Sequence, residues 1–206
     1  KALMHSAISA DRKLDIVWVE AGLLEDNTLA DDPPGHAEAW AKVHNVDGIL
    51  VPGGFGERGT EGKILAAKYA RENQVPFLGI CLGMQAAVIE YARSVLGMKN
   101  AHSTEMVPDC AEPAVIFMPE GSTTHMGGTM RLGSRRTIFQ TQDCKAAKLY
   151  NSLPFIDERH RHRYEVNPDI VDRLEEAGCV FVGKDETNRR MEILELCDHP
   201  FFLATQ

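Results

Sequence analysis

Two short apolar runs separated by a helical pattern place the strongest limit on how this chain can fold. Residues 47–51, "DGILV", predict a buried strand, residues 60–72 predict a helix, and residues 75–80, "VPFLGI", predict a second strand. Parallel strands joined by a helix form a right-handed crossover, and such units build an open, mostly parallel sheet with helices on both faces. The chain is therefore expected to belong to the α/β class.

The flanking sequence extends this pattern. "LDIVWVE" at 14–20 predicts another strand, while "HAEAWAKVH" at 36–44 and "MQAAVIEYARSV" at 84–95 predict helices, the second with one apolar face. In the C-terminal half, six short runs predict antiparallel additions to the sheet: "AVIFM", "TIFQT", "HRYEV", "CVFVGK", "MEILEL" and "FFLAT". A chain of 206 residues, 44% of them hydrophobic, can bury one core, so we expect a single domain over 1–206.

Charge and composition argue against several classes of protein. The net charge of -8 is unlike that of a sequence-independent nucleic-acid binder, which needs a basic face to neutralise phosphates. No apolar run approaches the ~18 residues of a membrane span, and no signal peptide is recognisable at the start. The five cysteines include no C-x-x-C pair for zinc or redox chemistry. A cytoplasmic enzyme is the expectation.

The loop "GGFGERG" contains Gly54, Gly56 and Gly59 in the spacing G-x-G-x-x-G of a dinucleotide-binding site. Such a site also needs an acidic residue about 20 positions further on, at the tip of the next strand. Cys81 stands at that tip. The phosphate-loop pattern fails as well, because its first glycine falls on Glu57. The sequence therefore predicts neither nucleotide-binding motif.

Cys81 lies in "GICLG", residues 79–83, which has the form G-x-C-x-G between a strand and a helix. This pattern is typical of a nucleophile elbow, where the nucleophile is strained and small neighbours avoid collisions. Helical N–H groups next to the sulfur favour the thiolate. The backbone N–H groups of Leu82 and Gly54 are the candidate oxyanion donors. The alternative is a buried structural cysteine at the end of a core strand.

Five segments together resemble one enzyme family: "VPGGFGERGTEGK", "PFLGICLGMQ", "HSTE", "MGGTMRLG" and "ERHRHRYEVNP". Over essentially its whole length, the chain is similar to the triad-type glutamine amidotransferase domain of CTP synthases, of the eukaryotic kind. "GICLGMQ" is shared with many triad-type amidotransferases, whereas "GFGERGTEGK", "GGTMRLG" and "RHRHRYEVN" are specific to CTP synthases. The resemblance implies the class I amidotransferase fold and glutamine hydrolysis, with ammonia delivered to a separate synthetase domain.

The resemblance also implies roles for individual residues. Cys81 matches the nucleophile, and the match assigns the two candidate oxyanion donors above to the same role. Gln85 and Glu105 match positions that receive the α-amino end of glutamine. Arg163 matches the arginine that binds the α-carboxylate, with the Tyr164 backbone beside it. One acid and one bidentate cation suit a zwitterionic substrate.

Cofactors and partners are implied in the same way. Arg58 resembles a lid arginine, and Phe55, Arg58 and the segment 126–133 are expected near the place where GTP acts as an allosteric activator. The domain itself is expected to hold no cofactor, since ATP, UTP and Mg²⁺ belong to the synthetase domain. The full-length protein is expected to be a homo-oligomer, a tetramer, with no nucleic-acid or membrane partner.

The segment "RHRHR" places His160 and His162 on one face of a strand and its three arginines on the other. A nucleic-acid patch and a metal pair are both conceivable. The chain has only this one short basic run, however, and two histidines without a nearby third ligand do not form a zinc site. We expect no metal, and a charge network at the edge of the sheet instead.

The chain departs from the family pattern at both ends. Family domains begin with a further strand and continue into an aromatic-His-Pro-Glu segment, which supplies the triad base and its orienting acid. His199 precedes Pro200 but is followed by Phe201 rather than Glu, so it is not a substitute. With Cys81 as the one triad member present, we expect no glutaminase turnover from the 206-residue chain alone.

Two alternative functions stay open at this point. A different cysteine hydrolase, such as a γ-glutamyl peptidase, could use the same elbow. A regulatory or scaffold domain could keep the fold without turnover. Labelling of Cys81 by a glutamine-derived electrophile would separate the enzymes from the scaffold.

Overall fold

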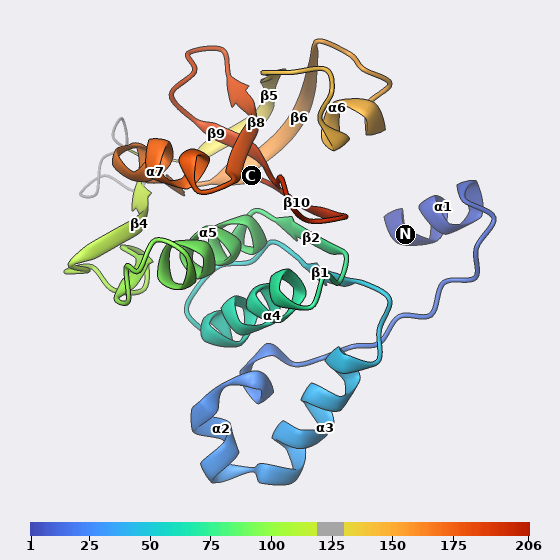
Figure 1. The fold of residues 1–206 in the computed structure, drawn as a ribbon, viewed down its shortest axis with the longest axis vertical. Coiled ribbons are helices and arrows are strands. Elements are labelled where there is room, and N and C mark those ends of the chain that lie inside the picture. Colours follow the sequence, from blue (N-terminus) through green and yellow to red (C-terminus); the bar gives the residue numbers. More distant parts are fainter. Residues whose placement is uncertain (119–129) are drawn as a thin grey trace.

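The computed structural model describes residues 1–118 and 130–206, and it is built around a seven-stranded sheet (Figure 1). The order of the strands is β1-β2-β10-β9-β8-β5-β6. β2 pairs in parallel with β1 and with β10, and the remaining neighbours are antiparallel. The strands are β1 (Ile49–Val51), β2 (Phe77–Ile80), β5 (Arg131–Phe139), β6 (Phe155–His162), β8 (Cys179–Asp185), β9 (Met191–Leu196) and β10 (Phe202–Thr205).

A smaller sheet has the order β3-β4-β7. Its strands are β3 (Ala101–Ser103), β4 (Glu112–Phe117) and β7 (Tyr164–Val166). The helices are α1 (Ala2–Ser9), α2 (Asp26–Asp31), α3 (Pro33–His44), α4 (Thr60–Glu72), α5 (Leu82–Ser94), α6 (Lys145–Leu149) and α7 (Val171–Glu176), with short 3₁₀ turns η1 (Ala21–Leu24) and η2 (Pro168–Ile170). No described helix is both long and apolar enough to cross a bilayer.

The predicted α/β class, the crossover β1-α4-β2 and the antiparallel additions are confirmed. Two details of the C-terminal half were predicted wrongly. The run "FFLAT" forms β10, which pairs in parallel with β2 and only on its other side antiparallel with β9. The run "AVIFM" and the end of "HRYEV" form β4 and β7, which belong to the smaller sheet. Strand partners depend on the whole topology, which a local pattern does not contain.

Side chains of β10 show how the main sheet is covered on both faces. Phe202 and Ala204 point into the larger core, which also contains buried residues of α4, α5 and α7. Leu203, between them, points into a smaller core that includes Ala146 and Ala147 of α6. Alternate residues of a strand face opposite sides of a sheet. Helices therefore cover both faces, as the sequence predicts.

Helix α5 is more deeply buried than its sequence suggests. The pattern predicts one apolar face, but every residue from 82 to 92 is buried. The helix contacts β2 and β10 of the main sheet and also β3, β4 and β7 of the smaller sheet. Because α5 lies between two sheets, it has no solvent-facing side over most of its length. Its N-terminus is thereby held in one position at the end of β2.

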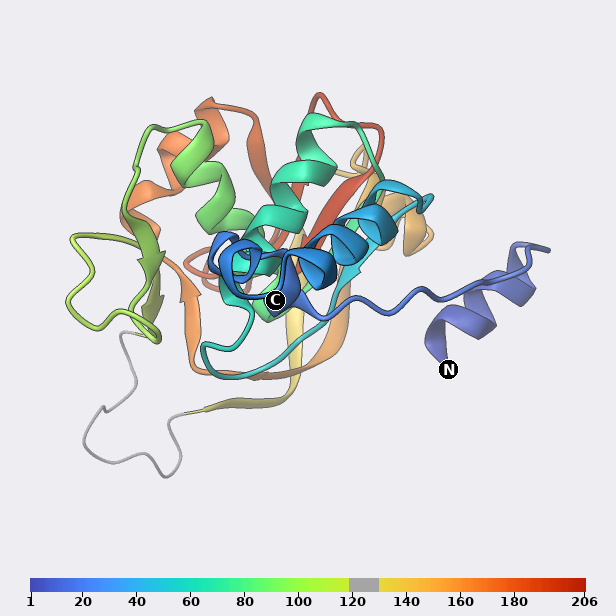
Figure 2. The same ribbon diagram turned by 90° about the horizontal axis from the view of Figure 1, so that it is seen from below.

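The strand predicted at 14–20 does not form. Residues 12–20 have no regular secondary structure, and Trp18 is 82% exposed. Figures 1 and 2 show α1 and the extended segment after it lying apart from the rest of the molecule. A strand needs a neighbour to accept its backbone hydrogen bonds. Among the described residues, no strand pairs with this segment.

The stacked rings of Phe77 and Phe202 are expected to stabilise the centre of the main sheet. Their centroids are 4.3 Å apart, and both side chains are buried. We expect Phe202→Ala to lower the free energy of unfolding by about 3–5 kcal/mol, through lost burial and an unfilled cavity. Urea denaturation of both proteins measures the loss. The control is Leu149→Ala at an exposed site, with an expected change within ~0.5 kcal/mol. Equal losses would contradict the central position of this pair.

Candidate active site

The predicted elbow is present at the junction of β2 and α5. Cys81 is the N-cap residue of α5 and has φ 52° and ψ -105°. A positive φ is strained for a residue with a side chain and persists only where surrounding contacts enforce it. One such contact is the Cys81 N–H, which donates to the carbonyl oxygen of Thr205 in β10 at 2.7 Å. The thiol is thus placed where two neighbouring parallel strands end.

The glycines on either side of Cys81 are required by close backbone contacts. A Cβ on Gly79 would lie 2.8 Å from the carbonyl carbon and oxygen of Gly83. A Cβ on Gly83 would lie 2.2 Å from the carbonyl oxygen of Val51. Real Cβ atoms do not approach backbone this closely, so both positions must lack one. These contacts give the G-x-C-x-G spacing its physical reason.

Two backbone N–H groups are directed at the Cys81 sulfur. They belong to Leu82 and Gly54, and both lower the pKa of the thiol by hydrogen bonding. These are the two donors that the sequence predicts for an oxyanion. Gly53, which sequence reasoning missed, also approaches closely, since a Cβ there would lie 3.3 Å from the Cys81 Cβ. The sequence did offer a signal for this close approach, because two consecutive glycines stand at positions 53 and 54.

The ionisation of Cys81 differs from the prediction. The helix N-terminus was expected to favour the thiolate, but burial raises the pKa of the Cys81 thiol above its ordinary value. The charge of Glu105 raises that pKa further. The N–H groups and the charge of Arg161 lower it, without offsetting the burial. Desolvation of a half-buried thiol therefore dominates, and it cannot be read from the motif.

Arg161 is a second residue that sequence reasoning did not assign to the site. Its guanidinium lies 5.3 Å from the ring centroid of Phe55, and its charge acts on the Cys81 thiol. Its neighbour His160 faces the other way and is buried. The predicted alternation of "RHRHR" is confirmed, and β6 is the edge strand of the main sheet. The sequence did contain a signal for Arg161. The alternation places Arg161 on the same face of the strand as Arg163, which the sequence analysis had assigned to the site.

The remaining predicted residues gather around the elbow. Gln85 is buried, and its side-chain Nε2 donates to the Tyr164 carbonyl oxygen at 3.0 Å and to Gln206 Oε1 at 3.4 Å. Burial raises the pKa of Glu105, while the N–H of Gly56 and the charge of Arg163 lower it. Opposite charges on Glu105 and Arg163 thus act on one another beside the thiol.

Arg58 and the expected lid segment, 126–133, differ from the residues above, because no contact of theirs with the thiol is seen among the described residues. The Arg58 side chain is 87% exposed and forms an ion pair with Glu20. Phe55 packs against Arg161, whose charge acts on the thiol, and is itself exposed. Of the segment 126–133, residues 126–129 lie outside the described part of the chain.

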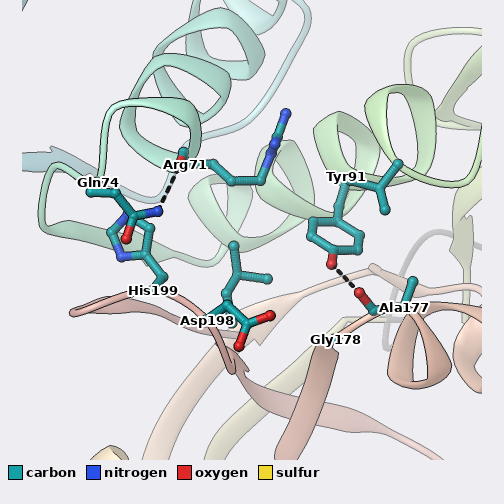
Figure 3. Close-up of a pocket in the computed structure, with 9 residues that line it drawn as sticks. Arg71, Gln74, Tyr91, Ala177, Gly178, Asp198 and His199 are labelled. Carbon is teal, nitrogen blue, oxygen red and sulfur yellow. Dashed lines mark hydrogen bonds between the residues drawn. The ribbon is translucent and has the colours of Figure 1, made fainter.

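His199 is held in a structural role by two hydrogen bonds to the backbone. Its Nε2 donates to the carbonyl oxygen of Ala70 at 3.0 Å, and its Nδ1 accepts from the N–H of Phe201 at 3.1 Å. Figure 3 shows it beside Gln74 in a pocket with Arg71, Tyr91 and Asp198. Cys81 is not among the residues that line this pocket. The rejection of His199 as a base agrees with this geometry.

The comparisons with known proteins agree with the site. Residues 1–206 match the family "Glutamine amidotransferase class-I". The chain belongs to the class-I glutamine amidotransferases. Its sequence is 57% identical to a CTP synthase of Candida glabrata and 53% identical to CTP synthase 2 of Xenopus laevis, each over the whole chain and 36% of the relative. This amidotransferase chain thus spans about a third of these relatives.

Solved structures agree with this assignment. The glutaminase domain of Trypanosoma brucei CTPS, solved with bound acivicin, has a TM-score of 0.89 and 37% identity, and the match covers 98% of this chain and 75% of that one. The amidotransferase chain therefore belongs with the glutaminase domains of CTP synthases. A glutamine amidotransferase of Thermotoga maritima, at 13% identity and a TM-score of 0.50, shares the fold alone.

The charge environment predicts how Cys81 of this amidotransferase responds to pH. Because its thiol pKa is raised, the thiolate fraction increases only at a higher pH than in a free thiol, whose pKa is about 8.5. We expect the rate of alkylation of Cys81 by iodoacetamide, followed by peptide mass spectrometry, to rise with pH later than that of glutathione. Arg161→Ala should move this profile to still higher pH. Arg159→Ala, an exposed change on the same strand, is the control. Identical profiles for both variants would remove Arg161 from the thiol environment.

Proposed function

We propose that this chain is a glutaminase domain that hydrolyses glutamine to glutamate and ammonia. The observation that carries the proposal is a strained cysteine at an elbow, with the N–H groups of Leu82 and Gly54 directed at its sulfur. Acyl transfer needs this combination of a nucleophile and preorganised donors. The bound acivicin in the related Trypanosoma brucei domain supports it further.

In the proposed reaction, the Cys81 thiolate attacks the carbon of the glutamine side-chain amide. The carbonyl oxygen becomes an oxyanion held by the N–H groups of Leu82 and Gly54. The C–N bond then breaks, the nitrogen takes up a proton and leaves as ammonia, and a γ-glutamyl thioester remains. Water cleaves the thioester, which releases glutamate and restores the thiol. A general base must handle these protons.

Recognition of the substrate follows from the charges beside the thiol. We assign the α-amino group of glutamine to Glu105 and Gln85, and the α-carboxylate to Arg163 with the Tyr164 backbone. An ammonium next to Glu105 also neutralises a charge that raises the pKa of the Cys81 thiol. In this proposal, binding of substrate itself favours the reactive thiolate.

The proposed context is a complete CTP synthase. Ammonia passes to a synthetase domain, where ATP, UTP and Mg²⁺ support the amination of UTP to CTP, and the amidotransferase domain needs no cofactor of its own. GTP acts as an activator near Phe55 and Arg58. The complete enzyme is proposed to be a cytoplasmic homotetramer. The relatives named CTP synthase, at 52–57% identity over this whole chain, support this context.

The role of Cys81 is tested in the complete enzyme that contains this chain. We expect Cys81→Ala to abolish CTP formation with glutamine as nitrogen donor, because no thioester can form. CTP formation with ammonium salts should continue, since it uses a separate site. Steady-state rates with each donor measure both effects. Equal loss of both activities in a folded variant would refute the assignment.

The roles of Glu105 and Arg163 are tested by single substitutions to alanine. Each should weaken glutamine use by ~1–3 kcal/mol, the cost of a lost charge-assisted hydrogen bond, which is a decrease of about 5- to 150-fold in kcat/KM. Ammonia-dependent synthesis should be unchanged. Arg159→Ala serves as the matched control. Glutamine kinetics equal to those of this control would exclude the substituted residue from the site.

A further inference from the structure

A cluster of buried ionisable side chains lies on the face of β6 opposite to Arg161. Its histidines, His160 and His162, come from β6. The other members are Arg131 of β5, Glu165 of β7, Asp185 of β8, Glu192 of β9 and the nearby Arg190. His160 is 5% exposed, His162 2% and Glu192 1%. Charged and titratable groups are rarely buried to this extent unless they are paired or coordinate a metal. The glutaminase reaction does not use this cluster.

Three of these side chains bring possible metal ligands together. His160 Nδ1 lies 3.1 Å from His162 Nε2 and 3.5 Å from Glu192 Oε2, and the three ligand atoms lie within 4.8 Å of one another. In a tetrahedral zinc site with bonds of about 2.0–2.1 Å, neighbouring ligand atoms are about 3.3 Å apart. The observed spacing fits such a site with little rearrangement. The third ligand, which the sequence did not reveal, comes from β9.

The hydrogen bonding of the cluster is incomplete without a further group. His162 Nδ1 and both carboxylate oxygens of Glu192 are buried and have no hydrogen-bond partner of acceptable geometry among the described residues. Roughly 90% or more of buried polar groups in proteins are hydrogen-bonded. A cation held by Glu192 Oε2 would remove one of these deficits directly.

Neighbouring charges are placed as outer-sphere partners of such a cation. Glu165 Oε1 lies 3.7 Å from His162 Nδ1, the ring nitrogen that faces away from His160. A metal-bound histidine usually donates this second N–H to a carboxylate. Arg131 Nη2 lies 2.8 Å from Glu192 Oε1, which leaves Oε2 directed at the histidines.

The donor atoms and charges of the cluster also suit a cation. His160 and His162 each carry an imidazole, and a neutral imidazole has one nitrogen with a free lone pair and one N–H. Each can turn one lone pair to a metal and keep its proton on the other nitrogen. Ion pairs connect three carboxyl groups, those of Glu165, Asp185 and Glu192, with two guanidinium groups, those of Arg131 and Arg190. The carboxyl groups therefore outnumber the guanidinium groups by one.

The geometry points to a zinc site formed by His160 Nδ1, His162 Nε2 and Glu192 Oε2, with water as the fourth ligand. Its three protein ligands are buried, and their number leaves the fourth position to water. Bound zinc cross-links β6 to β9 and fixes the strand whose other face carries Arg161 toward Cys81. This inference does not depend on the glutaminase proposal.

Zinc content provides the direct test. The protein that contains this chain is produced with zinc, dialysed against a weak chelator and analysed by inductively coupled plasma mass spectrometry. We expect about one zinc per chain in the wild type and in Cys81→Ser, which removes a competing thiol. His162→Gln and Glu192→Gln should bind zinc at least ~10-fold more weakly. His5→Gln, a change on the exposed helix α1, should bind zinc like the wild type.

Two results would overturn the site. One is a wild type that retains no zinc, and the other is unchanged binding in folded His162→Gln and Glu192→Gln variants, with folding checked by circular dichroism. If these variants unfold, Co²⁺ bound to the wild type decides the question. The expected spectrum is that of tetrahedral Co²⁺ with nitrogen and oxygen ligands. An octahedral spectrum, or a thiolate charge-transfer band, would assign the metal elsewhere.

Discussion

The contact between the first turn of α5 and the backbone of β1 determines the geometry of the active site. Gly83 meets the carbonyl oxygen of Val51 so closely that no Cβ fits between them. This approach forces the chain to turn sharply at Cys81, which adopts a positive φ. The hydrogen bond from Cys81 to Thr205 ties the same turn to β10. The position of the thiol, and of the donors around it, follows from this packing.

The environment of the thiol is a balance between burial and nearby charge. Burial and Glu105 disfavour the thiolate, whereas Arg161 and two backbone N–H groups favour it. Glu105 itself is held between burial, which raises its pKa, and the charge of Arg163, which lowers it. Charges of both signs therefore act around a half-buried thiol. Such surroundings suit a small zwitterion better than a purely anionic or cationic molecule.

The edge strand β6 serves two different environments through its alternation. Its arginines face solvent and the active site, while His160 and His162 face the interior. The interior face gathers Glu192 from β9 and Arg131 from β5 into one connected set. Positioning of the substrate-facing side chains is thus coupled, through a single strand, to a buried polar cluster. Rigid support of this kind is what precise substrate orientation requires.

The sequence by itself determined the crossover and the elbow, because each depends on local periodicity or on a short steric pattern. The candidate residues Gln85, Glu105 and Arg163 followed instead from the resemblance of the sequence to the amidotransferase family. The sequence did not determine which strands pair with one another or which distant side chains come into contact. Residues 14–20 have the pattern of a strand, yet no described strand lies beside them. The raised pKa of the Cys81 thiol depends on burial by distant segments. Glu192 reaches the two histidines from about 30 residues away only because β9 and β6 belong to the same sheet, with β8 and β5 between them. Desolvation and long-range side-chain contacts are properties of the packed chain, so only the tertiary structure decided them.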